Sequence, residues 1–143
     1  MTAMTMTKMY RAKRVAGLFL MTIATAGAAD AALADTPAIP TTAPLSAGEI
    51  VQLLDGRSFQ FHNYDRPLTG TTHWDIKAHR VTGDYDYAGI FTGNFQAGWM
   101  LNGDQSCTTD KYQGTVCLKI YRYGNGFMEV TDKGKVHAVS VPQ

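Results

Sequence analysis

The sequence predicts a mainly β domain, in which an antiparallel meander forms a small barrel or a strongly curved sheet and one short helix lies at the N-terminus. Three observations support this prediction. From Arg57 onward, apolar and polar residues alternate with a period of two, as in strands with one buried face. Short glycine- and asparagine-containing connections separate eight such runs, as in meanders and barrels. A helical period occurs once, just before Gly56.

The first 34 residues have the parts of a secretory signal peptide. In order, they are a basic start (Lys8, Arg11, Lys13, Arg14), an apolar run (15–26) and a small-residue cleavage site (Ala32-Leu33-Ala34). The apolar run is shorter than the roughly 20 residues that span a bilayer, so no stable membrane span is expected. We therefore expect the mature chain to comprise residues 35–143 and to be periplasmic or secreted.

The charge of this mature chain is small. The whole sequence has 13 basic and 12 acidic residues, and the predicted signal peptide contains four of the basic and one of the acidic ones, which leaves a net charge of −2. The longest basic cluster of the expected mature chain is Lys133-Gly134-Lys135. Nucleic-acid binding normally needs a basic stripe, so we expect no nucleic-acid partner.

Cys107 and Cys117 are expected to form one disulfide, because export places the chain in an oxidising compartment. Closing so short a loop stabilises the fold by roughly 2.5–3 kcal/mol in the chain-entropy model. A redox-active pair would favour C-x-x-C spacing or basic neighbours, and the sequence has neither.

A tether and a helix precede the strands. Residues 35–44 contain Pro37, Pro40 and Pro44 and predict an extended tether, followed by a single domain over 45–143. Ser46 and Glu49 form a capping-box pattern at the start of the helix, which Gly56 ends. Its apolar stripe consists of Ile50, Leu53 and Leu54, with Leu45 as a hydrophobic staple. A helix with one apolar stripe is expected to pack on the sheet as a lid or plug.

Eight strands follow. The alternation places them near residues 57–62, 70–76, 79–87, 95–101, 105–109, 115–123, 127–132 and 135–141.

Two Asn-Gly pairs predict hairpin registers. A turn at Asn125-Gly126 would place Arg122 opposite Glu129 and Lys119 opposite Asp132, with the face of Tyr121, Tyr123, Met128 and Val130 toward the core. A turn at Asn102-Gly103 leaves two registers open. Cys107 would face Gly98 or Trp99, and we favour Trp99, whose indole would cover the disulfide.

The sequence contains no common catalytic signature, whether a nucleophile elbow, a zinc-protease helix, a P-loop or a dinucleotide fingerprint. The four histidines are His62, His73, His79 and His137, and none has a second histidine at i+2 or i+4. We therefore expect no metal site and no cofactor. Asp84 and Asp86 flank Tyr85 on an outward face and are a carboxylate pair that a hydrolase mechanism could use.

The many aromatic residues are compatible with a binding function, because inward aromatic side chains can line a ligand cavity in a small barrel. They can equally fill the interior of the barrel. The candidate cavity residues are Phe59, Phe61, Trp74, Tyr85, Tyr87, Trp99, Tyr121 and Tyr123. Whether the barrel is filled or hollow stays open at this point. A second candidate site is the loop between the cysteines, which comprises Thr108, Thr109, Asp110, Lys111, Tyr112, Gln113 and Gly114.

The chain resembles a loose class of short exported bacterial domains of unknown function. The resemblance covers about Leu45 to Lys135 and rests on the opening helix, Gly98 and Trp99, the two cysteines and the final segment 121–127. It implies a β-rich exported domain and no particular activity. In size, compartment and single disulfide, the chain is also similar to small exported barrels that inhibit lysozymes or proteases.

These observations favour a non-enzymatic exported domain that binds a small ligand or an envelope or extracellular protein. Inhibition of a secreted hydrolase, such as a lysozyme or a protease, is one alternative function. Envelope hydrolysis through Asp84 and Asp86 is the other.

Overall fold

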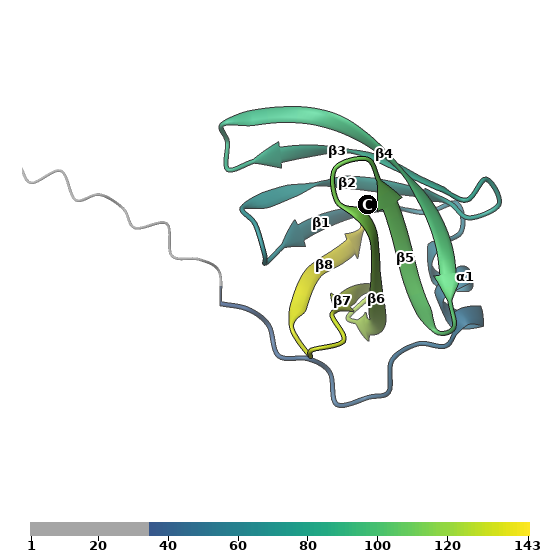
Figure 1. The fold of residues 1–143 in the computed structure, drawn as a ribbon. Helices are drawn as coiled ribbons and strands as arrows, with labels where there is room; N and C mark the ends of the chain where they lie inside the picture. The colour runs from purple at the N-terminus through teal and green to yellow at the C-terminus, as the bar shows by residue number, and fades with distance from the viewer. Residues whose placement is uncertain (1–34) are drawn as a thin grey trace, which may run out of the picture. The chain divides into compact units, whose positions relative to one another are not determined.

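The computed structural model describes residues 35–143, which form a closed eight-stranded barrel with one helix (Figure 1). The predicted signal peptide lies outside the described residues. The elements are α1 (Ala47–Leu54), β1 (Ser58–Asn63), β2 (Leu68–Asp75), β3 (Arg80–Tyr87), β4 (Phe91–Asn102), β5 (Gln105–Asp110), β6 (Gly114–Tyr123), β7 (Gly126–Val130) and β8 (Val136–Pro142). Within this part of the chain, no helix is long and apolar enough to cross a membrane.

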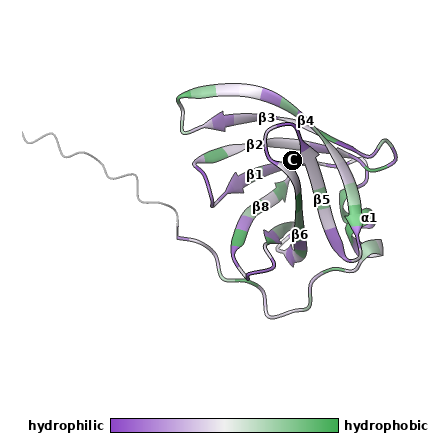
Figure 2. Cartoon of the chain, in the orientation of Figure 1, coloured by the Kyte–Doolittle hydropathy of each residue, from purple (hydrophilic) through white to green (hydrophobic). Residues whose placement is uncertain are grey.

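Every strand pairs antiparallel with the next one in sequence, and β8 closes the barrel on β1. The closing register runs from Phe59 opposite Pro142 to Asn63 opposite Ala138. Hydrophobic and hydrophilic residues succeed one another along the long strand β4 (Figure 2), as a wall with an inner and an outer face requires. The predicted fold class, an antiparallel meander closed into a barrel with one short helix, is therefore confirmed.

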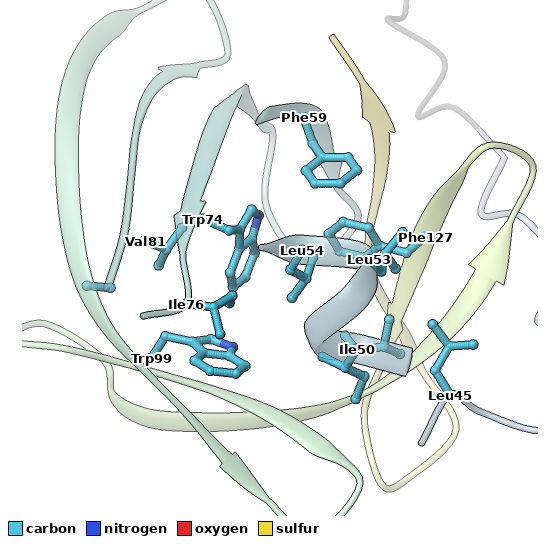
Figure 3. Packing of buried hydrophobic residues seen from close by; sticks show 12 residues of the cluster. Leu45, Ile50, Leu53, Leu54, Phe59, Trp74, Ile76, Val81, Trp99 and Phe127 are labelled. Carbon is cyan, nitrogen blue, oxygen red and sulfur yellow. The ribbon is translucent and has the colours of Figure 1, made fainter. Parts of the chain in front are cut away.

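Helix α1 plugs one end of the barrel. Its start has the predicted capping box, in which the Ser46 N–H donates to the Glu49 carboxylate at 2.8 Å and holds the pKa of that carboxyl below its ordinary value. Its buried stripe of Ile50, Leu53 and Leu54 packs among core aromatics (Figure 3). These aromatics are Phe59, Trp74, Trp99 and Phe127. The helix therefore closes the end at which β1 begins and β2 ends.

Trp99 lies in this core with its only polar atom satisfied. The indole N–H donates a buried hydrogen bond of 2.9 Å to the Ser106 hydroxyl, which points inward from β5. The ring of His79 stacks on the indole with centroids 6.5 Å apart. Both cysteines, by contrast, lie on the outer face of their hairpin.

Replacing Ser106 with alanine is expected to lower the free energy of unfolding by about 1–3 kcal/mol, because the indole N–H would stay buried without an acceptor. Denaturant unfolding monitored by tryptophan fluorescence measures this change. Ser58→Ala is the control, since the Ser58 hydroxyl bonds His73 in an exposed pair. Equal losses in the two variants would contradict the assigned role of the Ser106 hydroxyl.

The predicted register of the last hairpin is wrong. The turn residues are Gly124 and Asn125, so Tyr123 pairs with Gly126 and Arg122 faces Phe127 instead of Glu129. Gly124 has the positive φ of 57°. Gly126 is already in β7, where a Cβ atom would overlap the Ser140 carbonyl of β8. The glycine of the Asn-Gly pair, Gly126, is therefore not a turn residue. Its role is to let β7 pack closely on β8.

The charge pairs predicted for this hairpin are only partly formed. Lys119 lies opposite Val130 in the sheet, yet its ammonium group still reaches the Asp132 carboxylate at 3.8 Å. Among residues 35–143, Glu129 has no such partner, and it faces the barrel interior.

Both registers considered for Asn102-Gly103 are also wrong. The turn residues are Gly103 and Asp104, so Cys107 pairs with Met100, and Trp99 lies on the opposite face of β4. The disulfide joins Cys107 to Cys117, which are direct partners in β5 and β6 with Cα atoms 4.0 Å apart. Asp104 is held at this turn because its carboxylate accepts the Ala47 N–H of α1 at 2.8 Å.

The face assigned to the core in β6 and β7 is the outer face of the barrel. Tyr121, Tyr123, Met128 and Val130 belong to a second apolar cluster, separate from the interior. Ile39 packs against this cluster from the segment 35–44, which has neither helix nor strand. The inward residues of β6 include Leu118 and Ile120. The tether thus buries the outer face of β7, and the aromatic content of that face misled the sequence-based assignment.

Candidate binding cavity

The barrel is hollow at the end opposite α1. A cavity of about 1040 Å³ opens there, slightly larger than the volumes typical of small-molecule sites. Its floor consists of Trp74, Val81 and Leu118, which adjoin the packed core. Its mouth includes residues of the β1–β2 and β5–β6 connections.

Glycines in the wall explain why the aromatic residues do not fill this space. Gly93 lies opposite Tyr85, and a Cβ atom on Gly93 would come within 2.6 Å of the Tyr85 hydroxyl oxygen. Gly83 lies opposite Phe95, and a Cβ atom on Gly83 would overlap the Thr71 carbonyl oxygen of β2 and come within 2.8 Å of the Phe95 ring. Each ring therefore lies over the position that a side chain on the neighbouring glycine would occupy. The barrel keeps an open, aromatic-lined interior as a result.

More aromatic rings line the mouth on the β3–β4 side. Tyr87 and Phe91 are stacked with centroids 5.0 Å apart, and Tyr85 meets Phe91 edge to face at 6.2 Å. Phe91 is half exposed, and Ile90 beside it is 76% exposed. Stacked and edge-to-face pairs hold one another in place. This wall can therefore offer a preformed apolar surface to a ligand.

The cavity also borders a stretch of β4 that has a partner on one side only. Phe91 to Ala97 pair with β3, but β4 pairs with β5 only from Gly98 to Asn102. The ribbons of β4 and β5 diverge in this region (Figure 1). Asn94 and Gln96 from the free stretch and Thr109 from β5 all line the cavity. The polar rim thus extends down the side of the barrel.

A polar cluster forms the wall between β1 and β8. His137 bonds Asp65 through Nδ1 at 2.6 Å and Asn63 through Nε2 at 3.2 Å. Burial alone would raise the pKa of Asp65, but hydrogen bonds from Lys135 and His137, together with their charges, lower it overall. The cluster is therefore a fully bonded structural unit.

Glu129 lines the same cavity without such bonds. It points inward from β7, and no hydrogen bond or ion pair reaches its carboxylate from residues 35–143. Burial raises the pKa of Glu129, and the charge of His137 acts in the opposite direction. Glu129 is thus the one acidic side chain in the cavity wall that lacks a protein partner among the described residues.

The predicted cavity residues fall into three places. Phe61, Trp74, Tyr85 and Tyr87 line the cavity. Phe59 and Trp99 lie in the core beneath it. Tyr121 and Tyr123 lie on the outer face. Sequence reasoning did not select Asn63, Arg66, Glu129 and His137, because their inward position depends on the registers and on the bulge between Glu129 and Val130.

The predicted loop lies at the mouth of the cavity. Thr108 to Gln113 line it, whereas Gly114 does not and takes a positive φ of 71° at the start of β6. The Asp110 carboxylate accepts the backbone N–H groups of Tyr112 and Gln113 at 2.6 and 2.7 Å. Tyr112 itself is 84% exposed, with the Lys111 ammonium 4.8 Å from its ring centroid. The loop therefore has a fixed backbone and an exposed aromatic tip.

Other candidate groups serve the scaffold. Asp84 accepts hydrogen bonds from the Thr71 N–H and hydroxyl, and Asp86 accepts one from the Gly89 N–H at 2.6 Å. Both aspartates alternate with the inward Tyr85 and therefore face outward. Across residues 35–143, no three His, Cys, Asp or Glu side chains converge as metal ligands do.

The fold and the cavity define the class of protein: an eight-stranded antiparallel barrel, plugged at one end by a helix and hollow at the other. No protein-family model, curated protein or solved structure matches the chain.

Proposed function

We propose that this domain is an exported, non-enzymatic binding protein that holds a small apolar molecule inside its barrel. The observation that carries the proposal is the cavity itself, which is lined by aromatic rings and open at one end. A preformed cavity with an aromatic wall is a usual setting for a small ligand, because burying the apolar part of the ligand against that wall removes apolar surface from water. Export is supported by the signal-like N-terminal sequence and by the disulfide.

The scaffold suits such a role. The core around α1 holds the floor, and the disulfide fixes the β5–β6 hairpin near the mouth. Because the wall aromatics already pack on glycines, little side-chain ordering is left for the moment of binding. A preorganised site loses less conformational entropy when its ligand enters.

A neutral fluorescent probe, N-phenyl-1-naphthylamine, tests the proposal. We expect saturable fluorescence enhancement with the unmodified protein and at least about tenfold weaker binding by Val116→Trp. Val116 points into the cavity from β6, so an indole there would occupy the ligand's space. Val141→Trp is the matched control, because Val141 is 41% exposed on the outer face of β8.

Two results would contradict the proposal. One is the absence of saturable binding by the unmodified protein. The other is equal loss in the Val116→Trp and Val141→Trp variants, which would place the probe elsewhere on the surface.

A further inference from the structure

Glu129 occupies an unusual position for an acidic residue. It is the last but one residue of β7 and lies opposite the fully buried Ile120 of β6 and the buried Ala138 of β8. The preceding inward residue of the strand, Phe127, belongs to the core. The carboxylate therefore stands directly above the packed floor of the barrel, and its accessible part faces the cavity.

A carboxylate in such a place has an energetic cost unless something pairs with it. An ionised group in apolar surroundings loses hydration, and that loss is recovered only through a counter-charge or hydrogen bonds. Asp65, in the β1–β2 connection, has Lys135 and His137 as partners. Glu129 has no hydrogen-bond donor or cation from residues 35–143 within bonding distance, and burial raises its pKa.

The neighbouring charged groups do not supply the missing partner. On β8, the two ring nitrogens of His137 are engaged by Asp65 and Asn63. Arg66 and Lys111 line the exposed mouth and form no ion pair with Glu129. Asp110 is held by backbone N–H groups of its own loop. The remaining titratable groups on the cavity wall are the phenols of Tyr85, Tyr87 and Tyr112.

We propose that the cavity selects an amphipathic cation, whose apolar body packs against the aromatic wall and whose ammonium group pairs with the Glu129 carboxylate. This inference rests on the proposed function, since it names the ligand class of the same cavity. A charge-assisted hydrogen bond shielded from water is much stronger than one at the surface. The aromatic rings of Tyr85 and Tyr87, which line the same cavity, can also attract a cation.

An amphipathic anion held by Arg66 is the main competing ligand. Arg66 is exposed in the β1–β2 connection, where its charge is hydrated and screened by salt. An anion that reached the floor would meet Glu129. Because the Glu129 carboxylate lies inside the barrel and the Arg66 guanidinium lies at the exposed mouth, the cavity favours a cationic ligand over an anionic one.

Three compounds with the same eight-carbon chain test the inference by isothermal titration calorimetry: octylammonium, 1-octanol and octanoate. Near neutral pH, we expect octylammonium to bind at least about tenfold more tightly than 1-octanol, and octanoate to bind most weakly. In Glu129→Gln, the advantage of octylammonium should disappear while 1-octanol binds as before. Asp55→Asn is the control for net charge, since Asp55 is exposed beside α1 at the closed end and should keep the preference.

The unmodified protein provides a second test that needs no variant. As the pH falls through the raised pKa of Glu129, the carboxyl is protonated, so octylammonium should bind progressively less tightly while 1-octanol is unaffected.

The outcomes separate the two proposals. Equal binding of octylammonium and 1-octanol, or a preference that survives in Glu129→Gln, overturns the cation inference and leaves the apolar cavity intact. Stronger binding of octanoate assigns the ligand charge to Arg66 instead and also overturns it. If none of the three compounds and no neutral probe binds, the proposed function fails together with the inference.

Discussion

Replacing Phe127 with alanine is expected to lower the free energy of unfolding by about 3–5 kcal/mol, the largest effect of any single substitution considered for this barrel. Phe127 is fully buried, and its ring meets Phe59 edge to face at 4.9 Å and Trp74 at 6.3 Å. The ring belongs to the same buried cluster as the stripe of α1 (Figure 3). Truncation would therefore leave a void that neither the helix nor the strands can close.

Chemical denaturation of Phe127→Ala, compared with Phe91→Ala, measures this contribution. Phe91 is also aromatic and inward on its strand but is 51% exposed at the mouth, so its loss should cost less than about 1 kcal/mol. Comparable losses in the two variants would mean that the helix-plugged end is not the main core of the domain.

The difference between these two phenylalanines indicates that one end of the barrel provides stability and the other end provides the binding site. The end around α1 concentrates the fully buried side chains and supplies stability. The opposite end has exposed aromatics and a stretch of β4 that is paired with β3 only, which favour binding. Ligand sites are commonly drawn from the less stable part of a fold.

The fold was predictable because each of its signals is local. The capping box of Ser46 and Glu49 and the period-two alternation depend only on neighbouring residues. The hairpin registers were not predictable from the Asn-Gly pairs. Gly126 is needed because β8 packs too closely on it for a side chain to fit. Asp104 forms a turn that is held by a hydrogen bond from α1. Both constraints come from elements distant in sequence.

The hollow interior was not predictable for the same reason, because it depends on the strand registers. Gly83 and Gly93 leave room for aromatic rings against the wall only because the register places them opposite Phe95 and Tyr85. Without that register, a count of aromatic residues suits a filled barrel as well as a hollow one. Glu129 was assigned to a surface charge pair for the same reason, because a shift of the hairpin register changed its partner from Arg122 to Ile120.

Removing the disulfide, by Cys107→Ala together with Cys117→Ala, is expected to lower the free energy of unfolding by about 3 kcal/mol. The two cysteines are direct partners in adjacent strands, so the native hairpin needs no rearrangement when the bond is absent. The loss arises mainly in the unfolded chain, which gains the conformational freedom of the opened loop. We therefore expect the variant to keep the barrel and its near-ultraviolet circular dichroism at low temperature.

The neighbouring pair on the same face of the hairpin supplies the control. Thr109 and Thr115 also lie directly opposite each other and share a side-chain hydrogen bond of 2.8 Å, but no covalent bond joins them. Thr109→Ala with Thr115→Ala should cost only about 0.5–1.5 kcal/mol. If this double variant lost as much stability as the cysteine variant, the cross-strand packing of the hairpin, rather than the covalent closure of its loop, would be the source of the stabilisation.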